Sequence, residues 1–172
     1  MLARTSRVSR PRAPRKLKKI MPQFSSKRRV RHAASDMFDL VADVEKYPQF
    51  VPLCSALRVK SRAQKDDAAV VVAEMTVAYK LIHQTFTSRV TLDRPNLKIL
   101  VEYLDGPFSR LQNRWTFAPA SEDASEIEFF IDYEFKSRTL AMLMGAMFDT
   151  AFRKFASAFE KRADEIYGRK SA

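Results

Sequence analysis

Alternating apolar and polar residues dominate the middle of the chain and predict a β-sheet. The clearest run has an apolar side chain at every second position, namely Ile127, Phe129, Ile131, Tyr133 and Phe135. A period of two is typical of a strand with one buried face and one mostly wet face. The same alternation recurs along residues 71–79 and, over a shorter stretch, along residues 99–103.

Weaker alternation adds four more strands and brings the expected number to about seven. They lie at residues 24–32, 57–62, 86–92 and 115–117. Turn-forming residues separate neighbouring strands at 64–67, 94–96, 106–107 and 119–125. Short connections of this kind favour an antiparallel meander over a parallel sheet.

Two helical regions complete the pattern. The first has Ser35 as its expected N-cap and an apolar stripe over residues 37–44, and Pro48 is expected to interrupt it at Tyr47. The second is long, with Ser137 as its expected N-cap and Gly168 as its expected stop. One face of it carries Leu140, Met144, Phe148, Ala151, Phe155, Phe159 and Ile166.

This order of elements predicts an α+β fold in which an antiparallel sheet of about seven strands wraps around the long C-terminal helix. A helix of about 30 residues spans about 45 Å, which is longer than any strand here, so it is expected to lie across the sheet. Such a sheet leaves a cavity beside the helix, and ligand cavities have volumes of roughly 300–1,000 Å³.

Charge divides the chain into a basic arm and a nearly balanced domain. The net charge is +11, but residues 1–20 hold eight Lys or Arg and no acid. The remainder holds 23 basic and 20 acidic side chains. We therefore expect a disordered arm at 1–20 and one folded domain at 21–170. Nucleic-acid binding inferred from the overall charge would rest on the arm alone, and no DNA partner is expected.

The arm has three interpretations. It is a basic segment that binds anionic lipid or RNA, an organelle transit peptide, or sequence upstream of a natural start at Met21. No apolar run is longer than nine residues, whereas a membrane span needs about 20. The chain is therefore not expected to cross a bilayer. The expected location is the cytoplasm, at the surface of the inner membrane, or the mitochondrial matrix side if the arm is a transit peptide.

Groups that support catalysis are sparse. The two histidines, His32 and His83, have no metal-binding spacing, and the one cysteine, Cys54, lies in an apolar stretch. We expect surface or structurally bonded histidines and a buried, inert thiol. No metal and no catalytic cofactor is expected.

One loop is both apolar and rich in proline. Residues 47–53 place six apolar side chains within seven positions. An irregular apolar segment predicts a lid over a cavity, or a plug that seals the core without a ligand. The segment Gly106-Pro107-Phe108 predicts a second rim of the cavity, or an ordinary turn anchored by one Phe.

The segment Val41 to Cys54, VADVEKYPQFVPLC, resembles the signature of the START-like family that includes coenzyme Q-binding proteins and the RatA ribosome-association toxins. Further pieces match in order at 106–108, 115–117 and 133–135, so the resemblance covers residues 21–170. One departure is Leu53, because relatives often carry Trp at this position. The resemblance implies the helix-grip fold of the polyketide cyclase-like superfamily and binding of a lipophilic quinone.

On this resemblance the chain is expected to be a non-catalytic carrier or chaperone for ubiquinone or a similar prenylated quinone, in support of respiration and in peripheral contact with a membrane. Two alternatives stay open: a RatA-type toxin that binds the large ribosomal subunit and blocks subunit association, and a cyclase- or aromatase-like enzyme. Met144 and Phe148 are expected to line the cavity, and Leu143 and Met147 to flank its mouth. The full set of expected ligand-binding residues is Tyr47, Pro48, Phe50, Val51, Pro52, Leu53, Phe86, Gly106, Pro107, Phe108, Leu111, Trp115, Leu140, Leu143, Met144, Met147 and Phe148.

Overall fold

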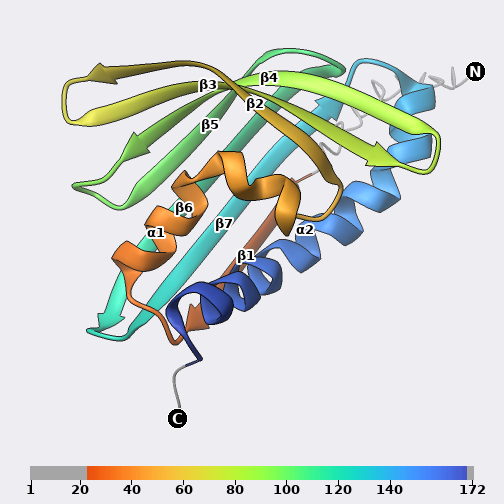
Figure 1. The fold of residues 1–172 in the computed structure, drawn as a ribbon. Coiled ribbons are helices and arrows are strands. Elements are labelled where there is room, and N and C mark those ends of the chain that lie inside the picture. Colours follow the sequence, from red (N-terminus) through yellow and green to blue (C-terminus); the bar gives the residue numbers. More distant parts are fainter. Residues whose placement is uncertain (1–22, 170–172) are drawn as a thin grey trace, which may run out of the picture.

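The computed structural model describes residues 23–169, in which one seven-stranded sheet curls around the helices (Figure 1). The predicted arm at 1–20 lies outside the described residues. In chain order the elements are β1 (Gln23–Val30), α1 (Ala34–Ala42), the 3₁₀ helix η1 (Val44–Gln49), β2 (Cys54–Lys65), β3 (Ala68–Tyr79), β4 (Ile82–Asp93), β5 (Lys98–Asp105), β6 (Phe108–Ser121), β7 (Ala124–Phe135) and α2 (Arg138–Tyr167). The prediction of an α+β helix-grip fold is confirmed.

The sheet is an antiparallel meander with one exception at its edge. The spatial order is β1-β7-β6-β5-β4-β3-β2, so the first strand pairs with the last. α2 packs against β1 and β7, whereas η1 packs against β2 at the other edge. In Figure 1, α1, η1 and α2 lie inside the curve of the sheet, and α1 packs against β5, β6 and β7.

Turns gather at two ends of this sheet. The hairpin end, as we call it, carries the tip between β3 and β4 at 79–82, the β5–β6 turn at 106–107 and the link from β7 to α2 at 136–137. The backbone N–H of Lys136 donates to the carbonyl of Pro107 at 2.9 Å, and this bond joins the β7–α2 link to the β5–β6 turn. The opposite end carries the β2–β3, β4–β5 and β6–β7 turns (Figure 1).

Period-two alternation identifies the inward face correctly. Along β7 every second residue from Ser125 to Phe135 is buried, as the pattern predicts. The core on this face is unusually aromatic. Phe108 lies at its centre with no exposed surface and stacks on Phe135 at a centroid distance of 4.9 Å. Burial of rings at this density supplies the main free energy of folding.

The start of the first helix differs from the prediction. Its N-cap is Ala33, not Ser35, and no side chain caps it. Burial explains the shift, because Ala34 and Met37 are both inside the core and packing sets the start. Pro48 lies within η1, after α1 has already ended at Ala42.

The long helix begins and ends where predicted. The side chain of Ser137 accepts a hydrogen bond from the backbone N–H of Leu140 at 3.2 Å. Gly168 follows the last residue with a φ of +83°, a conformation that glycine adopts at little cost. Ile166, expected on the buried face, is half exposed instead.

The turn predicted over residues 119–125 is much shorter than expected. β6 continues to Ser121 and β7 starts at Ala124, which leaves only Glu122 and Asp123 between them. Pro119 is accommodated within β6 beside a register irregularity, a position that sheets tolerate for a residue without an N–H donor.

Candidate functional site

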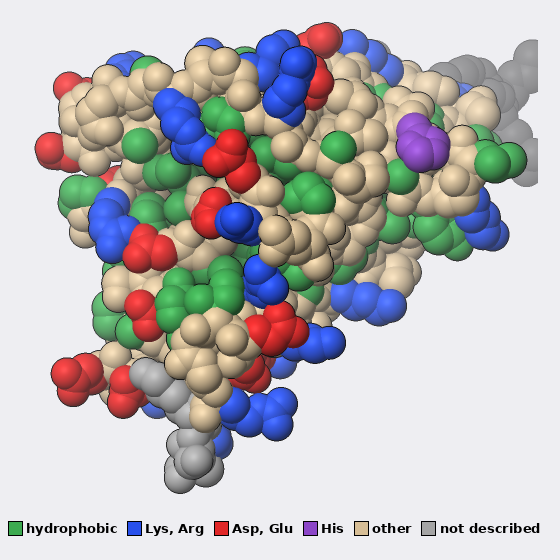
Figure 2. Space-filling model, in the orientation of Figure 1, with side chains coloured by type: hydrophobic (Ala, Val, Ile, Leu, Met, Phe, Trp, Pro, Cys, Tyr) green, Lys and Arg blue, Asp and Glu red, His purple; other side chains and the backbone are tan. Residues whose placement is uncertain are grey.

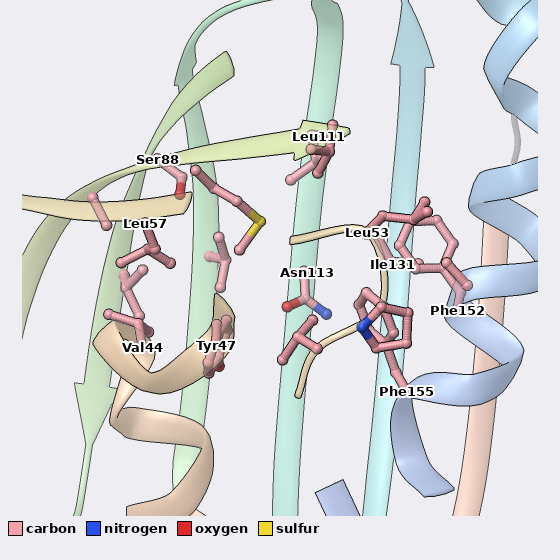
Figure 3. Close-up of a pocket in the computed structure, with 18 of the residues that line it drawn as sticks. Val44, Tyr47, Leu53, Leu57, Ser88, Leu111, Asn113, Ile131, Phe152 and Phe155 are labelled. Atoms are coloured by element: carbon pink, nitrogen blue, oxygen red, sulfur yellow. The ribbon is translucent and has the colours of Figure 1, made fainter. Parts of the chain in front are cut away.

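A cavity of about 100 Å³ lies between the lid, the concave face of the sheet and α2 (Figure 3). We use lid for η1 together with residues 50–53. The wall of the cavity comprises Val44, Tyr47, Val51, Pro52, Leu53, Leu57, Ala73, Met75, Val77, Phe86, Ser88, Val90, Ile99, Val101, Leu111, Asn113, Trp115, Ile131, Phe148, Ala151, Phe152, Phe155 and Phe159. Apolar side chains make up nearly all of this wall.

The cavity is smaller than the predicted 300–1,000 Å³. Aromatic rings explain the difference, because they fill the space between sheet and helix. Trp115 lies 5.2 Å from Phe159 and 4.7 Å from Phe129, measured between ring centroids. In this conformation the space is smaller than the dry apolar cavity of about 150 Å³ that is known to hold benzene.

Two polar side chains interrupt the apolar wall. Asn113 is internally bonded: its Nδ2 donates to the carbonyl of Phe130 and its Oδ1 accepts from Trp115 Nε1, both at 2.9 Å. Ser88 is also buried, and its hydroxyl has no hydrogen-bond partner among residues 23–169. Ser88 therefore offers a free hydroxyl to the cavity (Figure 3).

Tyr47 is the one ionisable residue in the wall. Its hydroxyl donates to the carbonyl of Val41 at 2.5 Å, which ties the lid to α1. Burial raises the pKa of Tyr47 well above its usual range, so the phenol stays protonated at neutral pH. A permanently protonated group that already donates its proton to the backbone is poorly suited to acid–base catalysis.

The lid is fastened to the second half of α2. The rings of Phe50 and Tyr47 meet Phe159 edge to face at 5.0 and 5.5 Å. Arg162 Nη2 donates to Gln49 Oε1 at 2.7 Å, and its guanidinium lies 5.4 Å from the Phe50 ring centroid. These contacts close the cavity on this side.

Part of the predicted ligand-binding set lies on the cavity wall. These residues are Tyr47, Val51, Pro52, Leu53, Phe86, Leu111, Trp115 and Phe148. In Figure 3 the lid contributes Tyr47 and Leu53 from one side and the sheet contributes Leu111 from the other. The structure thus brings together segments that are far apart in the sequence.

The remaining predicted residues do not line the cavity. Pro48 and Phe50 belong to the lid but are not among the wall residues, and Gly106 and Pro107 form the β5–β6 turn. The other members of this group are Phe108, Leu140, Leu143, Met144 and Met147.

The prediction for the start of α2 requires a correction. Met144 was expected on the cavity wall, but it is fully buried in the core beyond the cavity. Met147, expected at the mouth, packs against the core. Leu143 is 57% exposed, which leaves it free for an external contact. The reason is geometric, because the cavity lies beside the middle of α2, from Phe148 to Phe159.

Sequence reasoning missed the wall residues on the middle strands, although a signal for them was present. Ala73, Met75 and Val77 belong to an alternating run whose inward face was recognised. Ser88 and Asn113 are polar residues at inward-facing positions of otherwise apolar runs. A polar residue at an inward-facing position of an alternating apolar run therefore indicates a ligand cavity or a buried hydrogen bond.

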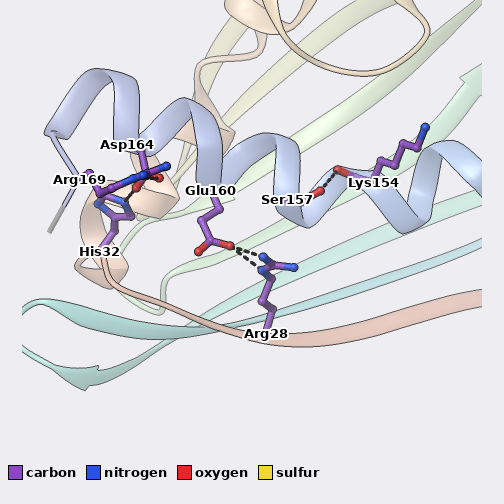
Figure 4. Close-up of polar contacts among 7 residues, drawn as sticks. All are labelled: Arg28, His32, Lys154, Ser157, Glu160, Asp164 and Arg169. Carbon is purple, nitrogen blue, oxygen red and sulfur yellow. Dashed lines mark hydrogen bonds and ion pairs between the residues drawn. The ribbon is translucent and has the colours of Figure 1, made fainter. Parts of the chain in front are cut away.

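The candidate catalytic groups lie apart from the cavity. Cys54 is 7% exposed, and burial raises the pKa of its thiol to about 11. His32 is buried and its Nε2 lies 2.8 Å from Asp164 Oδ1, whereas His83 is exposed (Figure 4). Within the described part of the chain, no group of three or more His, Cys, Asp or Glu is placed to hold a metal ion.

Comparison with known proteins gives consistent matches over this domain. A family profile described as polyketide cyclase / dehydrase and lipid transport matches residues 30–160. The ribosome association toxin RatA of Escherichia coli (strain K12) is 36% identical over 148 residues, which are 86% of this chain and 90% of that protein.

Two further relatives differ in what their names describe. The mitochondrial coenzyme Q-binding protein COQ10 homolog B of Xenopus laevis is 30% identical over 151 residues, 86% of this chain and 60% of that protein. The solution structure of an 18 kDa protein from Caulobacter crescentus is 34% identical, with a TM-score of 0.71 over 87% of this chain and all of that one. No helix within residues 23–169 is long and apolar enough to cross a membrane.

Proposed function

The chain belongs to the polyketide cyclase / dehydrase and lipid transport family, and on this premise we propose that it is a non-catalytic carrier of a lipophilic, ring-containing lipid of the ubiquinone class. The observation that carries the proposal is the cavity, whose wall is apolar except for the Ser88 hydroxyl and the polar groups of Tyr47, Asn113 and Trp115, which are bonded within the protein. Such a wall favours a ligand with much apolar surface and few polar atoms.

The chemistry of a prenylated quinone fits this wall. Its ring has carbonyl oxygens that accept hydrogen bonds, and the free hydroxyl of Ser88 is a donor of that kind. The rings of Trp115 and Phe159 offer aromatic faces for a flat ligand. Each CH₂ group of a prenyl tail that leaves water contributes about 0.8 kcal/mol to binding. A short buried part of the tail therefore supplies substantial affinity.

The size of the cavity implies that loading requires movement. A space of about 100 Å³ is smaller than a prenylated quinone needs, so the lid and α2 must separate to admit it. The contacts of Phe50 and Arg162 hold these two elements together and are the ones that opening would break. The described conformation is then the closed state of the carrier.

Extraction followed by mass spectrometry tests the proposal. Protein purified from quinone-producing cells is expected to release a prenylated quinone in up to equimolar amount. Ala151→Phe, which fills the cavity from α2, should abolish this, whereas Ala146→Phe on the exposed side of the same helix should not. Absence of prenylated lipid from the native protein, in repeated extractions, would remove the basis of the proposal.

A second candidate function is inhibition of ribosomal subunit association. The observation that favours it is the 36% identity to the toxin RatA, which extends over 90% of that protein. Sucrose-gradient profiles of ribosomes with added protein discriminate the two functions. If the chain inhibits subunit association, the fraction of assembled ribosomes should fall when the protein is added. The fall should be the same for the native protein and for Ala151→Phe.

An enzymatic function of the cyclase type has less support. Of the residues on the cavity wall, only Tyr47 is ionisable, and its proton is bonded to a backbone carbonyl. Proton transfer to a polyketide substrate needs a group with a pKa near the working pH. Burial raises the pKa of Tyr47 and so moves it further from neutral pH.

A further inference from the structure

Large apolar side chains that are exposed to solvent concentrate at the hairpin end. Among residues 23–169 there are seven of them, and five belong to this end: Tyr79, Leu81, Leu104, Met142 and Leu143. Leu81 is 97% exposed and Met142 is 84% exposed. The other two, Ile166 and Tyr167, lie at the far end of α2. A clustered apolar surface of this kind usually marks a contact site.

The lid of the cavity meets the same end. The backbone N–H of Ala78, next to the hairpin tip, donates to the carbonyl of Leu53 at 3.0 Å. Across the sheet, the β5–β6 turn is bonded to the start of α2 through Pro107 and Lys136. The exposed apolar side chains therefore lie at the end of the molecule where Leu53 of the lid meets β3.

Cations accompany the apolar side chains. Lys80, Lys136 and Arg138 are exposed, and none of them has a carboxylate partner among the described residues. The Nζ of Lys80 lies 5.3 Å from the ring centroid of Tyr79. Asp105 and Glu134, near the ends of β5 and β7, are the acidic residues that flank these turns.

The opposite end carries more acidic side chains. Its turns and their flanks hold Asp66, Asp67, Asp93, Glu122 and Asp123, together with the cations Lys65, Arg94 and Lys98. Figure 2 shows acidic side chains over the left and centre of the face that it displays, interspersed there with Lys and Arg. The right-hand part, where Figure 1 places the β3–β4 hairpin and the start of α2, shows Lys, Arg, a His and hydrophobic groups.

We propose that the hairpin end docks on an anionic phospholipid membrane, with Leu81, Met142 and Leu143 entering the interface and Lys80, Lys136 and Arg138 facing the lipid phosphates. Apolar side chains surrounded by cations match the two layers of such a surface. The acidic turns then point away from the membrane. This docking surface goes beyond the proposed carrier function, because vesicle binding does not depend on which ligand the cavity holds.

Other occupants fit this surface less well. A second copy of the chain, packed through the same end, would bring the three unpaired cations of each copy together. Single-stranded RNA is held by planar rings and guanidinium groups on which bases stack, and the most exposed groups here, Leu81 and Met142, are aliphatic.

Sedimentation of the full chain with vesicles tests the apolar part of the surface. Leu81→Ser and Leu143→Ser should each lower the partition coefficient onto vesicles containing phosphatidylglycerol about tenfold. Ile166→Ser is the matched control, because Ile166 is 50% exposed on the same helix at the other end. It should leave partitioning unchanged, and all three variants retain the same basic arm at 1–20.

The charged part is tested with Lys80→Gln. It should lower binding to phosphatidylglycerol vesicles about fivefold and leave binding to pure phosphatidylcholine vesicles unchanged. Lys65→Gln at the opposite end is the control and should change neither. A parallel measurement with a homopolymeric RNA should show no difference between the two lysine variants.

Two results would overturn the proposal. One is an equal effect of Leu143→Ser and Ile166→Ser, or no effect of either, which would assign vesicle binding to other parts of the chain. The other is weaker RNA binding in Lys80→Gln without a change in vesicle binding, which would make the surface a nucleic-acid contact. The quinone content of the same preparations reports on the carrier function separately, because these exposed substitutions leave the cavity wall intact.

Discussion

At the scale of single residues, the cavity wall differs from an ordinary core at Ser88. Its hydroxyl faces the cavity, whereas Phe86 and Val90, two positions away on either side along β4, are apolar. A ligand oxygen there would accept a hydrogen bond from this hydroxyl. Ser88→Ala is therefore expected to weaken quinone binding about fivefold while leaving the melting temperature equal or higher.

Titration of the quinone against Ser88→Ala, with Ser109→Ala as control, measures this effect. The Ser109 hydroxyl is exposed and donates to the carbonyl of Glu134, away from the cavity. Equal affinities for both variants would show that Ser88 makes no bond to the ligand.

The Cys54 thiol provides a second test at this scale. Because burial raises its pKa to about 11, the reactive thiolate is scarce at neutral pH. Alkylation by iodoacetamide in the folded protein is expected to be slow at pH 8 and to accelerate as the pH approaches 11. Rapid stoichiometric alkylation at pH 7 would indicate an activated cysteine and would reopen a catalytic function.

The pair of His32 and Asp164 makes stability depend on pH in the acid range. The hydrogen bond with His32 is the main cause that holds the pKa of the Asp164 carboxyl below its ordinary value of 3.8. A lowered folded-state pKa gives a stabilisation that is complete above about pH 4 and is lost as the pH falls through the folded value. The difference in melting temperature between the native protein and Asp164→Asn should therefore shrink as the pH falls below about 4. A constant difference at all pH values would contradict this assignment.

At the scale of elements, the junction of the lid with α2 controls access to the cavity. Arg162 donates a hydrogen bond to Gln49 of the lid. Arg153 lies earlier on the same helix and pairs with Asp149 at the exposed surface. We expect Arg162→Ala to accelerate quinone exchange with vesicles and Arg153→Ala to leave it unchanged. Stopped-flow transfer of quinone from protein to vesicles measures both rates. Equal rates in the two variants would place the opening elsewhere.

The elements themselves were largely predictable from the sequence, because alternation and capping are local. Ser137 and Gly168 bound α2 as expected, and the run ending at Phe135 is β7. Ser35 failed as a cap because burial of Ala34, a tertiary effect, starts the helix earlier.

The candidate site was only partly predictable, because it depends on contacts between distant segments. Phe148 and Met144 are one helical turn apart and equally apolar, yet only Phe148 reaches the cavity. The burial of His32 depends on Asp164, which lies 132 residues later in the chain. The volume of the cavity depends on how the aromatic rings pack, which no periodicity in the sequence encodes.

At the scale of the whole molecule, the structure combines an apolar cavity with a polarised exterior. The lid and the exposed Leu81 belong to one end, and Asp66 and Asp67 belong to the other. A carrier that exchanges a lipid with a membrane benefits from this arrangement, because docking brings the Leu53 end of the lid close to the bilayer. The variants described above test the cavity and the membrane-docking surface separately, so either proposal can fail without the other.

The central claim is that the cavity binds a quinone, and Trp115 reports on it directly. Trp115 is the only tryptophan of the chain and lies on the cavity wall. Quinones accept electrons from excited indole and quench its fluorescence. Titration with a short-chain ubiquinone analogue is predicted to quench Trp115 saturably, with one site per chain, in the native protein and in Ala146→Phe but not in Ala151→Phe. Absence of saturable quenching in the native protein, or equal quenching in folded Ala151→Phe, would contradict the account.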